Sequence, residues 1–489
     1  MKKALIFVHK WLGVGLALLF LMWFASGIVM VYVPFPSLAS EERLAGMRPL
    51  RLDGCCLGAQ EAAARAGIAV TEARLGMHGA LPVWRVLDSR KRWTTLDARD
   101  GAALAALSDA EAAQVAERFS GRRALHAERL ERDQWTVAQG YNPHRPLVRV
   151  AMAGEDGLEL YVSPGAAEVV LDTRRAERAW NWVGAVPHWL YFTQLRRWPE
   201  LWNGVVVWLS LPGVLLAASG VALGIWQLYL NGNRWIPYRK FWMRWHHILG
   251  LAGGVVCVTW ILSGLLSMNP FGVFSPRGAT PGERAAWSGK EVAAAANPAR
   301  ALVLAALPGA REIDLVQLQG QGWYRVRGAA GPGDQVLVSA SRLDDAVLSA
   351  LPPSFVMAAL TDLRAGEAGA GRPVLSRLTA YDGLYYAREP AGAAGTYTRP
   401  LPVWRAAWAD GVTLYADPAS ARLLLRADAG TPWQRVLYNG LHSFDFAPLV
   451  ARPLLRVSLL VGLCALGLVL CVTACVLAWR VLVPARRRG

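Results

Sequence analysis

Hydrophobic and polar positions divide this chain into four long apolar stretches separated by polar ones. Residues 11–38, 201–233, 248–275 and 457–479 contain no charged side chain. About 20 apolar residues cross the hydrocarbon layer of a bilayer as a helix, so each stretch is long enough to span it. The intervening segments are charged and too polar to span. The pattern predicts a membrane protein with a four-helix transmembrane bundle and two large soluble α+β segments.

Basic residues next to the apolar stretches predict the orientation. Lys2, Lys3 and Lys10 precede the first stretch, four basic residues lie within 234–245, and four more follow the last stretch. Short flanks rich in Lys and Arg remain in the cytoplasm. We therefore expect both termini and the 234–245 loop inside the bacterial inner membrane, and both soluble segments in the periplasm.

The resulting division of the chain has eight parts. They are a transmembrane helix at 1–34, a periplasmic domain at 35–198, a transmembrane helix at 199–233, a cytoplasmic loop at 234–245, a transmembrane helix at 246–275, a second periplasmic domain at 276–452, a transmembrane helix at 453–480 and a cytoplasmic tail at 481–489. The first apolar stretch is longer than the 7–15 residues of a signal peptide, so it is expected to remain as an anchor. The net charge of +16 needs no nucleic-acid partner, because no basic stripe is interleaved with stacking aromatics.

Two halves of the chain repeat each other, which indicates a tandem duplication. A spacing of 237 positions pairs His9 with His246, and it also pairs Leu12 with Leu249, Gly13 with Gly250, Trp23 with Trp260, Ser26 with Ser263 and Gly27 with Gly264. A spacing of 254 positions pairs the motif LYVSP at 160–164 with LYADP at 414–418, and His188 with His442. The change in spacing implies a net insertion of 17 residues in the second soluble segment.

Alternating apolar residues between turn signals predict paired strands in both soluble segments. The predicted strands are 81–87, 93–96, 148–153 and 158–162 in the first segment, and 322–326, 335–338, 403–408 and 412–416 in the second. A turn is expected at 97–101. Ser108, followed by Glu111 and an alanine-rich run to Phe119, predicts a helix with Ser108 as its N-cap.

Two motifs resemble those of the PepSY-associated transmembrane family. One is the helix start His9-Lys10-Trp11-Leu12-Gly13 with a later Ser-Gly, and the other is the external Leu-Tyr-Val-Ser-Pro unit that leads into a histidine. The resemblance covers nearly the whole chain. Some members are inner-membrane reductases of ferric siderophores that carry haem. The resemblance therefore implies PepSY-like periplasmic domains and electron delivery to iron in the periplasm.

The four duplicated histidines form one expected pair at each membrane face. His9 and His246 lie at the cytoplasmic ends of their helices, and His188 and His442 precede the helices that return from outside. Two neutral imidazoles give a six-coordinate haem iron suited to electron transfer. Because the chain has no Cys-x-x-Cys-His motif, we expect two non-covalent b-type haems.

Glycines at helical spacing support these two pairs. Gly13 and Gly250 follow the inner histidines by four positions, on the same helix face. Gly27 and Gly264 follow by 18 positions, which is five turns, so they face the same way about 27 Å further along. We expect them to leave room for the haems. The alternative is close packing of helices through small residues.

Other histidines and cysteines receive simpler interpretations. His247 neighbours His246 and points about 100° away, so it either supports the site or is an alternative ligand. His78, His126 and His144 are expected at the surface. Cys55 and Cys56 are not expected to pair, because adjacent cysteines do so poorly. Cys464, Cys471 and Cys475 share one helix face and are expected to pack in the bundle.

These features favour a membrane oxidoreductase, with no side chain needed as acid or base. Its electrons would pass from the inner pair to the outer pair and then to an external acceptor, which the resemblance implies is a ferric chelate. No nicotinamide, flavin or P-loop motif is visible, so the electron donor is a separate molecule, either a cytoplasmic reductase or a quinol. Two alternatives stay open: a non-enzymatic binding or regulatory protein with PepSY domains, and a quinol-linked b-type cytochrome.

Overall fold

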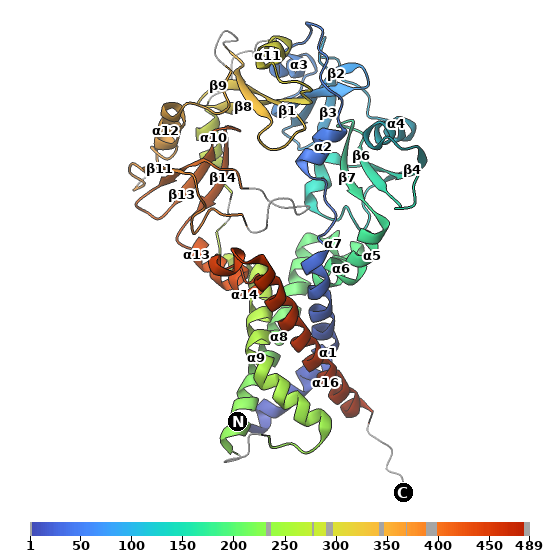
Figure 1. Ribbon diagram of the computed structural model, residues 1–489, viewed down its shortest axis with the longest axis vertical. Coiled ribbons are helices and arrows are strands. Elements are labelled where there is room, and N and C mark those ends of the chain that lie inside the picture. Colours follow the sequence, from blue (N-terminus) through green and yellow to red (C-terminus); the bar gives the residue numbers. More distant parts are fainter. Residues whose placement is uncertain are drawn as a thin grey trace.

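The computed structural model describes residues 2–230, 236–275, 278–289, 297–341, 347–367, 369–387 and 399–483. A bundle of long helices carries three β-sheets at one end, and the N-terminus lies at the other, which we call the free end (Figure 1). The basic residues Arg234, Arg486, Arg487 and Arg488, used above to orient the chain, lie outside the described residues.

The bundle contains four helices, as the apolar stretches predict. They are α1 (Lys2–Tyr32), α8 (Pro199–Leu230), α9 (Phe241–Ser267) and α16 (Pro453–Leu482). All four are long and apolar enough to cross a membrane. α1 packs against α16, and α8 packs against α9. Corresponding prolines, Pro199 and Pro453, begin α8 and α16, where the missing N–H costs no hydrogen bond.

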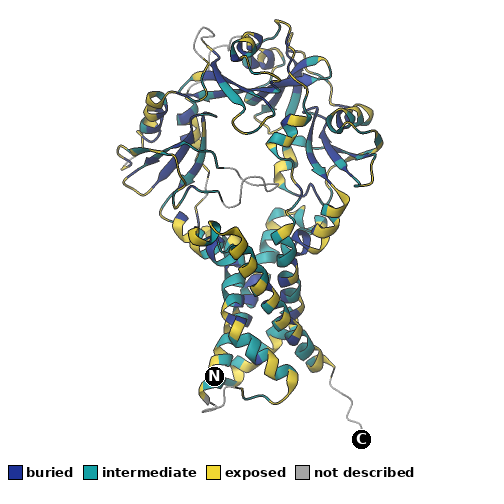
Figure 2. Ribbon diagram, viewed as in Figure 1, coloured by how far each residue is buried: buried dark blue, intermediate teal, exposed yellow. Residues whose placement is uncertain are grey.

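The surface of the bundle is apolar, which identifies the chain as a membrane protein. Leu18, Trp208 and Val255 are each more than 60% exposed. Figure 2 shows buried residues concentrated in the three sheets, whereas the long helices are mostly half-buried or exposed. Lipid covers such apolar surface, and the helices satisfy their own backbone groups in it.

Glycines allow the helices to approach closely. A methyl group at Gly467 of α16 would overlap the ring of Phe24 on α1. A methyl group at Gly213 of α8 would lie 3.1 Å from the Ile261 side chain of α9. Both contacts are of the small-residue kind that brings membrane helices together.

The two soluble segments share one sheet. Six strands lie in the order β10-β9-β8-β1-β2-β3, with antiparallel pairing throughout. The strands are β1 (Val70–His78), β2 (Leu81–Asp88), β3 (Trp93–Asp97), β8 (Glu312–Leu318), β9 (Gln321–Arg327) and β10 (Gln335–Ser339). The halves join at β1 and β8, where Leu75 lies opposite Ile313. The sequence does not reveal this join between the two expected domains.

Each segment also has a four-stranded antiparallel sheet of its own, between the shared sheet and the bundle (Figure 1). The first contains β4 (Ala124–Leu130), β5 (Leu147–Met152), β6 (Glu159–Ser163) and β7 (Glu168–Thr173). The second contains β11 (Val374–Leu378), β12 (Val403–Ala407), β13 (Thr413–Asp417) and β14 (Arg422–Ala427). All eight predicted strands are therefore confirmed, with bounds that differ by a residue or two.

Short helices cover the sheets and connect them to the bundle. The covering helices are α2 (Ser40–Gly46), α3 (Ala59–Arg65), α4 (Asp109–Ser120), α10 (Pro281–Ser288), α11 (Pro298–Ala305) and α12 (Pro353–Asp362). The connecting helices are η1 (Gln139–His144), α5 (Arg175–Val183), α6 (Ala185–His188), α7 (Thr193–Arg196), η2 (Pro270–Gly272), α13 (Thr431–Gln434), η3 (Arg435–Gly440), α14 (Leu441–Ser443) and α15 (Ala447–Val450). Ser108 caps α4 as predicted: its Oγ accepts from Glu111 N, and Glu111 Oε2 accepts from Ser108 N.

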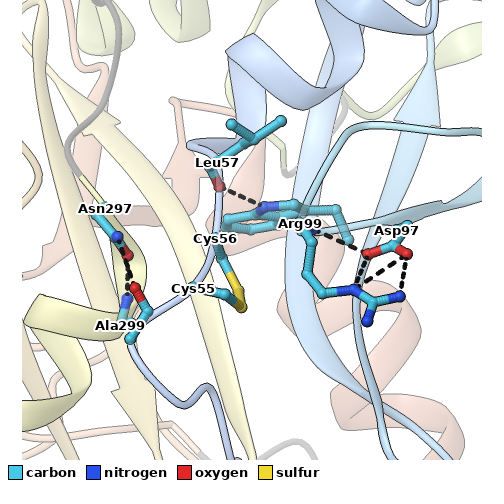
Figure 3. The surroundings of a disulfide bond; sticks show 9 residues. Cys55, Cys56, Leu57, Asp97, Arg99, Asn297 and Ala299 are labelled. Carbon is cyan, nitrogen blue, oxygen red and sulfur yellow. Dashed lines mark hydrogen bonds and ion pairs between the residues drawn. A yellow bond between two sulfur atoms is a disulfide. The ribbon is translucent and has the colours of Figure 1, made fainter.

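The expectation that Cys55 and Cys56 do not pair is wrong. The structure contains a disulfide between them, in the loop that leads into α3 (Figure 3). This loop touches the other half of the chain, because Asn297 Nδ2 donates to Gly54 O. The loop backbone brings the two sulfur atoms within bonding distance, and the sequence alone does not indicate this backbone conformation.

His144 also differs from its expected surface position. Its ring stacks on Trp93 at 5.8 Å between ring centres. Burial lowers the pKa of His144 to about 4. His126 is exposed, as expected, and His78 is half-buried. None of these three histidines lies in the bundle.

A buried ionic cluster stabilises the joint between the halves. Glu168 begins β7 and Glu312 begins β8. Arg43 of α2 contacts both: it donates to Glu312 at 2.7 and 2.8 Å and to Glu168 at 3.2 Å. Arg74 of β1 donates to Glu168 at 2.8 Å. Paired donors satisfy the oxygen atoms of both buried carboxylates, which removes most of the cost of burying them.

This cluster keeps its carboxylates ionised. Burial alone would raise the pKa of Glu168, but the guanidinium groups of Arg74, Arg43 and Arg85 outweigh it and lower the pKa to about 2. Burial likewise opposes ionisation of Glu312, and Arg43, Arg74 and Arg327 lower its pKa below the usual range. A lowered folded-state pKa contributes stability above the unfolded value and loses it as pH falls toward the folded value.

We predict that Glu168→Gln destabilises the soluble part by about 3 kcal/mol at pH 7, because it removes one of the two buried carboxylates that balance the charge of the buried guanidinium groups. The wild-type contribution should disappear between about pH 4.5 and pH 2, so the two proteins should converge there. Urea unfolding followed by tryptophan fluorescence measures both effects. Glu72→Gln is the matched control, since Glu72 is 43% exposed and lies 3.7 Å from Arg74. Equal destabilisation by the two variants would contradict the prediction.

Candidate functional site

The predicted inner pair comes together near the free end of the bundle. His9 lies on α1 and His246 lies on α9, and their ring centres are 6.3 Å apart with 46° between the ring planes. These helices are not neighbours in sequence. The bundle therefore brings two histidines that are distant in sequence close together in its interior.

The predicted outer pair comes together at the sheet end. His188 ends α6 and His442 lies in α14, and their ring centres are 6.2 Å apart with 68° between the planes. The two pairs are far apart along the bundle, because His188 contacts Ser26, which is 17 residues beyond His9 on α1. At a rise of 1.5 Å per residue this is about 26 Å.

Both ring separations fit two imidazoles on one metal ion. An imidazole nitrogen binds a metal at about 2.0–2.1 Å, and the ring centre lies about 1.2 Å behind it, so two opposed rings have centres about 6.4 Å apart. The observed values are 6.3 and 6.2 Å. Among the described residues, no group of three or more His, Cys, Asp or Glu side chains could hold a metal. Two protein ligands are enough for a six-coordinate haem iron, because the macrocycle supplies the other four.

Each of the four rings is held by a hydroxyl group from a neighbouring helix. At the inner end, His9 Nδ1 lies 3.2 Å from Ser219 Oγ, and His246 Nδ1 lies 3.0 Å from Thr473 Oγ1. At the outer end, His188 Nδ1 lies 3.0 Å from Ser26 Oγ. The fourth contact, between His442 Nδ1 and Ser263 Oγ, is also 3.0 Å.

All of these contacts are satisfied together when Nδ1 carries the proton. Each hydroxyl donates to the backbone carbonyl three residues earlier: Ser219 to Leu216 O, Thr473 to Leu470 O, Ser26 to Trp23 O and Ser263 to Trp260 O. A hydroxyl has one proton, so its oxygen can only accept from the imidazole. Nδ1 is therefore the protonated nitrogen, and Nε2 carries the lone pair. Metal-binding histidines are commonly oriented in this way by a partner at the other nitrogen.

Three glycines lie close to the histidine rings. A methyl group at Gly27 would lie 3.6 Å from His188 Cε1, and one at Gly264 would lie 3.7 Å from His442 Cε1. At the inner end, a methyl group at Gly220 would come within 2.7 Å of His9 Cε1. Gly220 was not singled out from the sequence, because its counterpart at the 254 spacing is Ala474.

A cavity of about 540 Å³ surrounds the inner pair. Its lining includes both inner histidines and the predicted glycines Gly13 and Gly250. Toward the bundle centre it reaches Phe20 and Cys257. The volume is within the range of small-molecule and cofactor sites, which are concave and mostly apolar with few polar groups. The inner end thus has both a ligand pair and space for a bulky apolar group.

His247 belongs to this cavity but not to the histidine pair. It is buried, lines the cavity, and packs edge-on against Tyr238 with 5.4 Å between ring centres. His246, and not His247, faces His9. The structure therefore favours the supporting role among the two interpretations of His247.

The outer histidines are positioned by an unusual backbone turn. Two residues after His188, Leu190 has a φ of 53°, and two residues after His442, Phe444 has a φ of 52°. A non-glycine residue in this left-handed region costs energy, and such residues often occur near functional sites. The reversal ends each short helix and leads the chain through α7 or α15 into the bundle helix that follows. In addition, Trp23 Nε1 donates to His188 O at 3.1 Å.

An apolar core fills the bundle between the two pairs. Phe20 and Phe24 of α1 pack there with Trp260 of α9. The buried cysteines Cys464 and Cys471 belong to the same core, as expected of small packing residues. Neither takes part in a disulfide. This core separates the two ends and excludes water from the space between them.

No family model matches the chain, and no curated protein sequence matches it. The site must therefore be interpreted from its own geometry.

We predict that Gly220→Ala disturbs the inner pair, because the added methyl group would displace the His9 ring. In protein produced with ample haem, the variant should lose about one of the two expected b-type haems per chain. The haem content by pyridine haemochrome assay measures this. Gly204→Ala on the same helix is the control, since nothing lies within 4 Å of its added methyl group. Full haem content in both variants would contradict the prediction.

We also predict that Thr473→Val lowers the affinity of the inner site for haem by about 10–100-fold, as removal of a hydrogen-bond partner of a metal ligand commonly does. Titration of haem-free protein measures the affinity. Thr259→Val on α9 is a matched control, because Thr259 Oγ1 makes the same bond to a carbonyl three residues earlier without contacting a histidine. Equal affinities in the two variants would show that the hydroxyl does not orient His246.

Proposed function

We propose that the chain is a di-haem oxidoreductase of the bacterial inner membrane that passes electrons from the cytoplasmic side to a periplasmic ferric chelate. One observation carries the proposal: two histidine pairs lie near opposite ends of the bundle, each with the ring separation of two imidazoles on one metal and with Nδ1 held by a hydroxyl. His9 and His246 would hold the inner haem, and His188 and His442 the outer one.

A tandem duplication accounts for the symmetry of this arrangement. Positions 237 apart make the same contacts, since Ser26 binds His188 and Ser263 binds His442. Positions 254 apart also agree, since Ser219 binds His9 and Thr473 binds His246. The β-strands also repeat between the halves, with β1–β3 in one half and β8–β10 in the other, although their spacing is 240–242 positions. Duplication of one helix–sheet–helix unit would produce both pairs at once.

The orientation of the chain gives the direction of electron flow. The free end carries Lys2, Lys3, Lys10, Lys240 and Arg480, and basic flanks remain in the cytoplasm. The sheets would then be periplasmic, as in the PepSY-like domains that the motifs resemble. The outer pair lies between the bundle and these sheets, where an acceptor in the periplasm can approach.

The chain's own residues position and insulate the redox groups. A haem iron with two imidazole ligands transfers one electron at a time between its ferric and ferrous states. The hydroxyl partners keep each Nε2 available as a ligand, and the apolar core around Phe24 excludes water. No side chain needs to gain or lose a proton.

The substrate that this arrangement serves best is a ferric siderophore or a similar iron chelate. One electron from the donor converts its Fe(III) to Fe(II), which hard oxygen ligands bind more weakly, so the metal is released. The donor is a separate molecule on the cytoplasmic side or a quinol in the membrane. The resemblance to the PepSY-associated transmembrane family supports this choice of acceptor.

The decisive experiment is the spectrum and reactivity of the purified protein. We predict a Soret band with about two b-type haems per chain. His9→Ala or His246→Ala should remove the inner haem, and His188→Ala or His442→Ala the outer one. Dithionite-reduced wild type, mixed anaerobically with a ferric siderophore, should release one Fe(II) per electron stored, measured with a ferrous-specific chelator.

His126→Ala is the matched control, because His126 is exposed and lies on β4, away from both pairs. It should retain both haems and full reduction of the chelate. Colourless wild-type protein made with adequate haem would favour a non-enzymatic binding role. Reduction of the haems by a quinol analogue, and not by a cytosolic donor, would favour a quinol-linked cytochrome.

A further inference from the structure

The inner cavity has two chemically different ends. Its deep end is apolar: Phe20 and Cys257 each lie 11 residues beyond an inner histidine on their helices, about 16 Å nearer the bundle centre. Its opposite end is basic: Lys240 and Arg480 line the cavity nearer the free end, Lys10 lines it beside His9, and all three are exposed. Arg480 is seven residues beyond Thr473 on α16, about 10 Å nearer the free end.

These three cations have no acidic side chain to pair with. The sequence contains no Asp or Glu before Glu41, none between Glu200 and Glu283, and none after Asp445. All helical residues at the free end therefore lie in acid-free parts of the chain. Basic flanks explain why cations occur on this side of the membrane, but they do not explain why three of them line the cavity that contains the histidine pair.

We propose that Lys10, Lys240 and Arg480 bind the carboxylates of the ligand held in the inner cavity. This inference rests on the proposed function and adds an orientation: the haem propionates point to the free end, and the apolar edge of the macrocycle points to Phe20 and Cys257. An amphiphilic ligand matches a cavity that is apolar at one end and basic at the other. Cationic donors bind carboxylates more strongly than neutral donors do.

The test compares haem with its dimethyl ester, which has the same macrocycle but no carboxylates. Both are titrated into haem-free, detergent-solubilised protein in a His188→Ala/His442→Ala background, so that only the inner pair binds. The readout is the Soret titration curve. Protein that keeps Lys10, Lys240 and Arg480 should bind haem at least about 10-fold more tightly than the ester.

In the same background, Lys10→Gln/Lys240→Gln/Arg480→Gln should weaken haem binding until it equals ester binding, and it should leave ester binding unchanged. Arg244→Gln is the matched control, because Arg244 is an exposed cation of α9 outside the cavity lining. It should keep the preference for haem.

The outcomes separate this inference from the function on which it rests. If neither compound binds, the proposed function fails. If haem and its ester bind equally well to protein that keeps the three cations, the haem function stands and the orientation is wrong. The same conclusion follows if the triple variant still binds haem more tightly than the ester. Haem and its ester would also bind equally if Lys10, Lys240 and Arg480 bind the phosphates of anionic lipid headgroups instead.

Discussion

A hydroxyl group that has already donated its proton can only accept, and this constraint organises the bundle. Ser219, Thr473, Ser26 and Ser263 each donate to a carbonyl one turn earlier on their own helix. The imidazole that contacts each hydroxyl completes this arrangement by supplying the proton from Nδ1. In a medium without water, such a bond cannot be replaced by solvent. Four rings thus acquire the same tautomer and a defined orientation from ordinary helix geometry.

The soluble part imposes a second constraint, because its halves are not independent. Pairing of β1 with β8 makes one sheet from both, and Arg43 binds Glu168 of one half and Glu312 of the other. The outer histidines follow β7 and β14, the last strands of the two halves. A rigid joint at the far side of the sheets therefore helps to keep these two chain segments at a constant separation where they enter the bundle.

Local patterns predicted much of this structure, and non-local contacts account for the rest. Apolar stretches predicted the four helices, alternation predicted eight strands, and equal spacing predicted both histidine pairs. The β1–β8 pairing joins residues about 240 positions apart, which alternation cannot indicate. The roles of Ser219 and Thr473 were missed, because a hydroxyl in an apolar helix usually bonds only to its own backbone. Leu190 and Phe444 gave no turn signal, since glycine is the usual residue at positive φ.

The outer and inner pairs differ in the kind of backbone that bears them. His9 and His246 lie within continuous helices of 31 and 27 residues. His188 and His442 lie at or near the ends of shorter helical runs, residues 185–188 and 431–443, which connect the sheets to the bundle, and a left-handed residue follows two positions after each histidine. A long helix resists bending, whereas a short connector transmits the movement of whatever is attached to it. A large molecule that settles on the sheets would therefore pull on the outer histidines and leave the inner ones undisturbed, so the two ends of the bundle have unequal mechanical sensitivity.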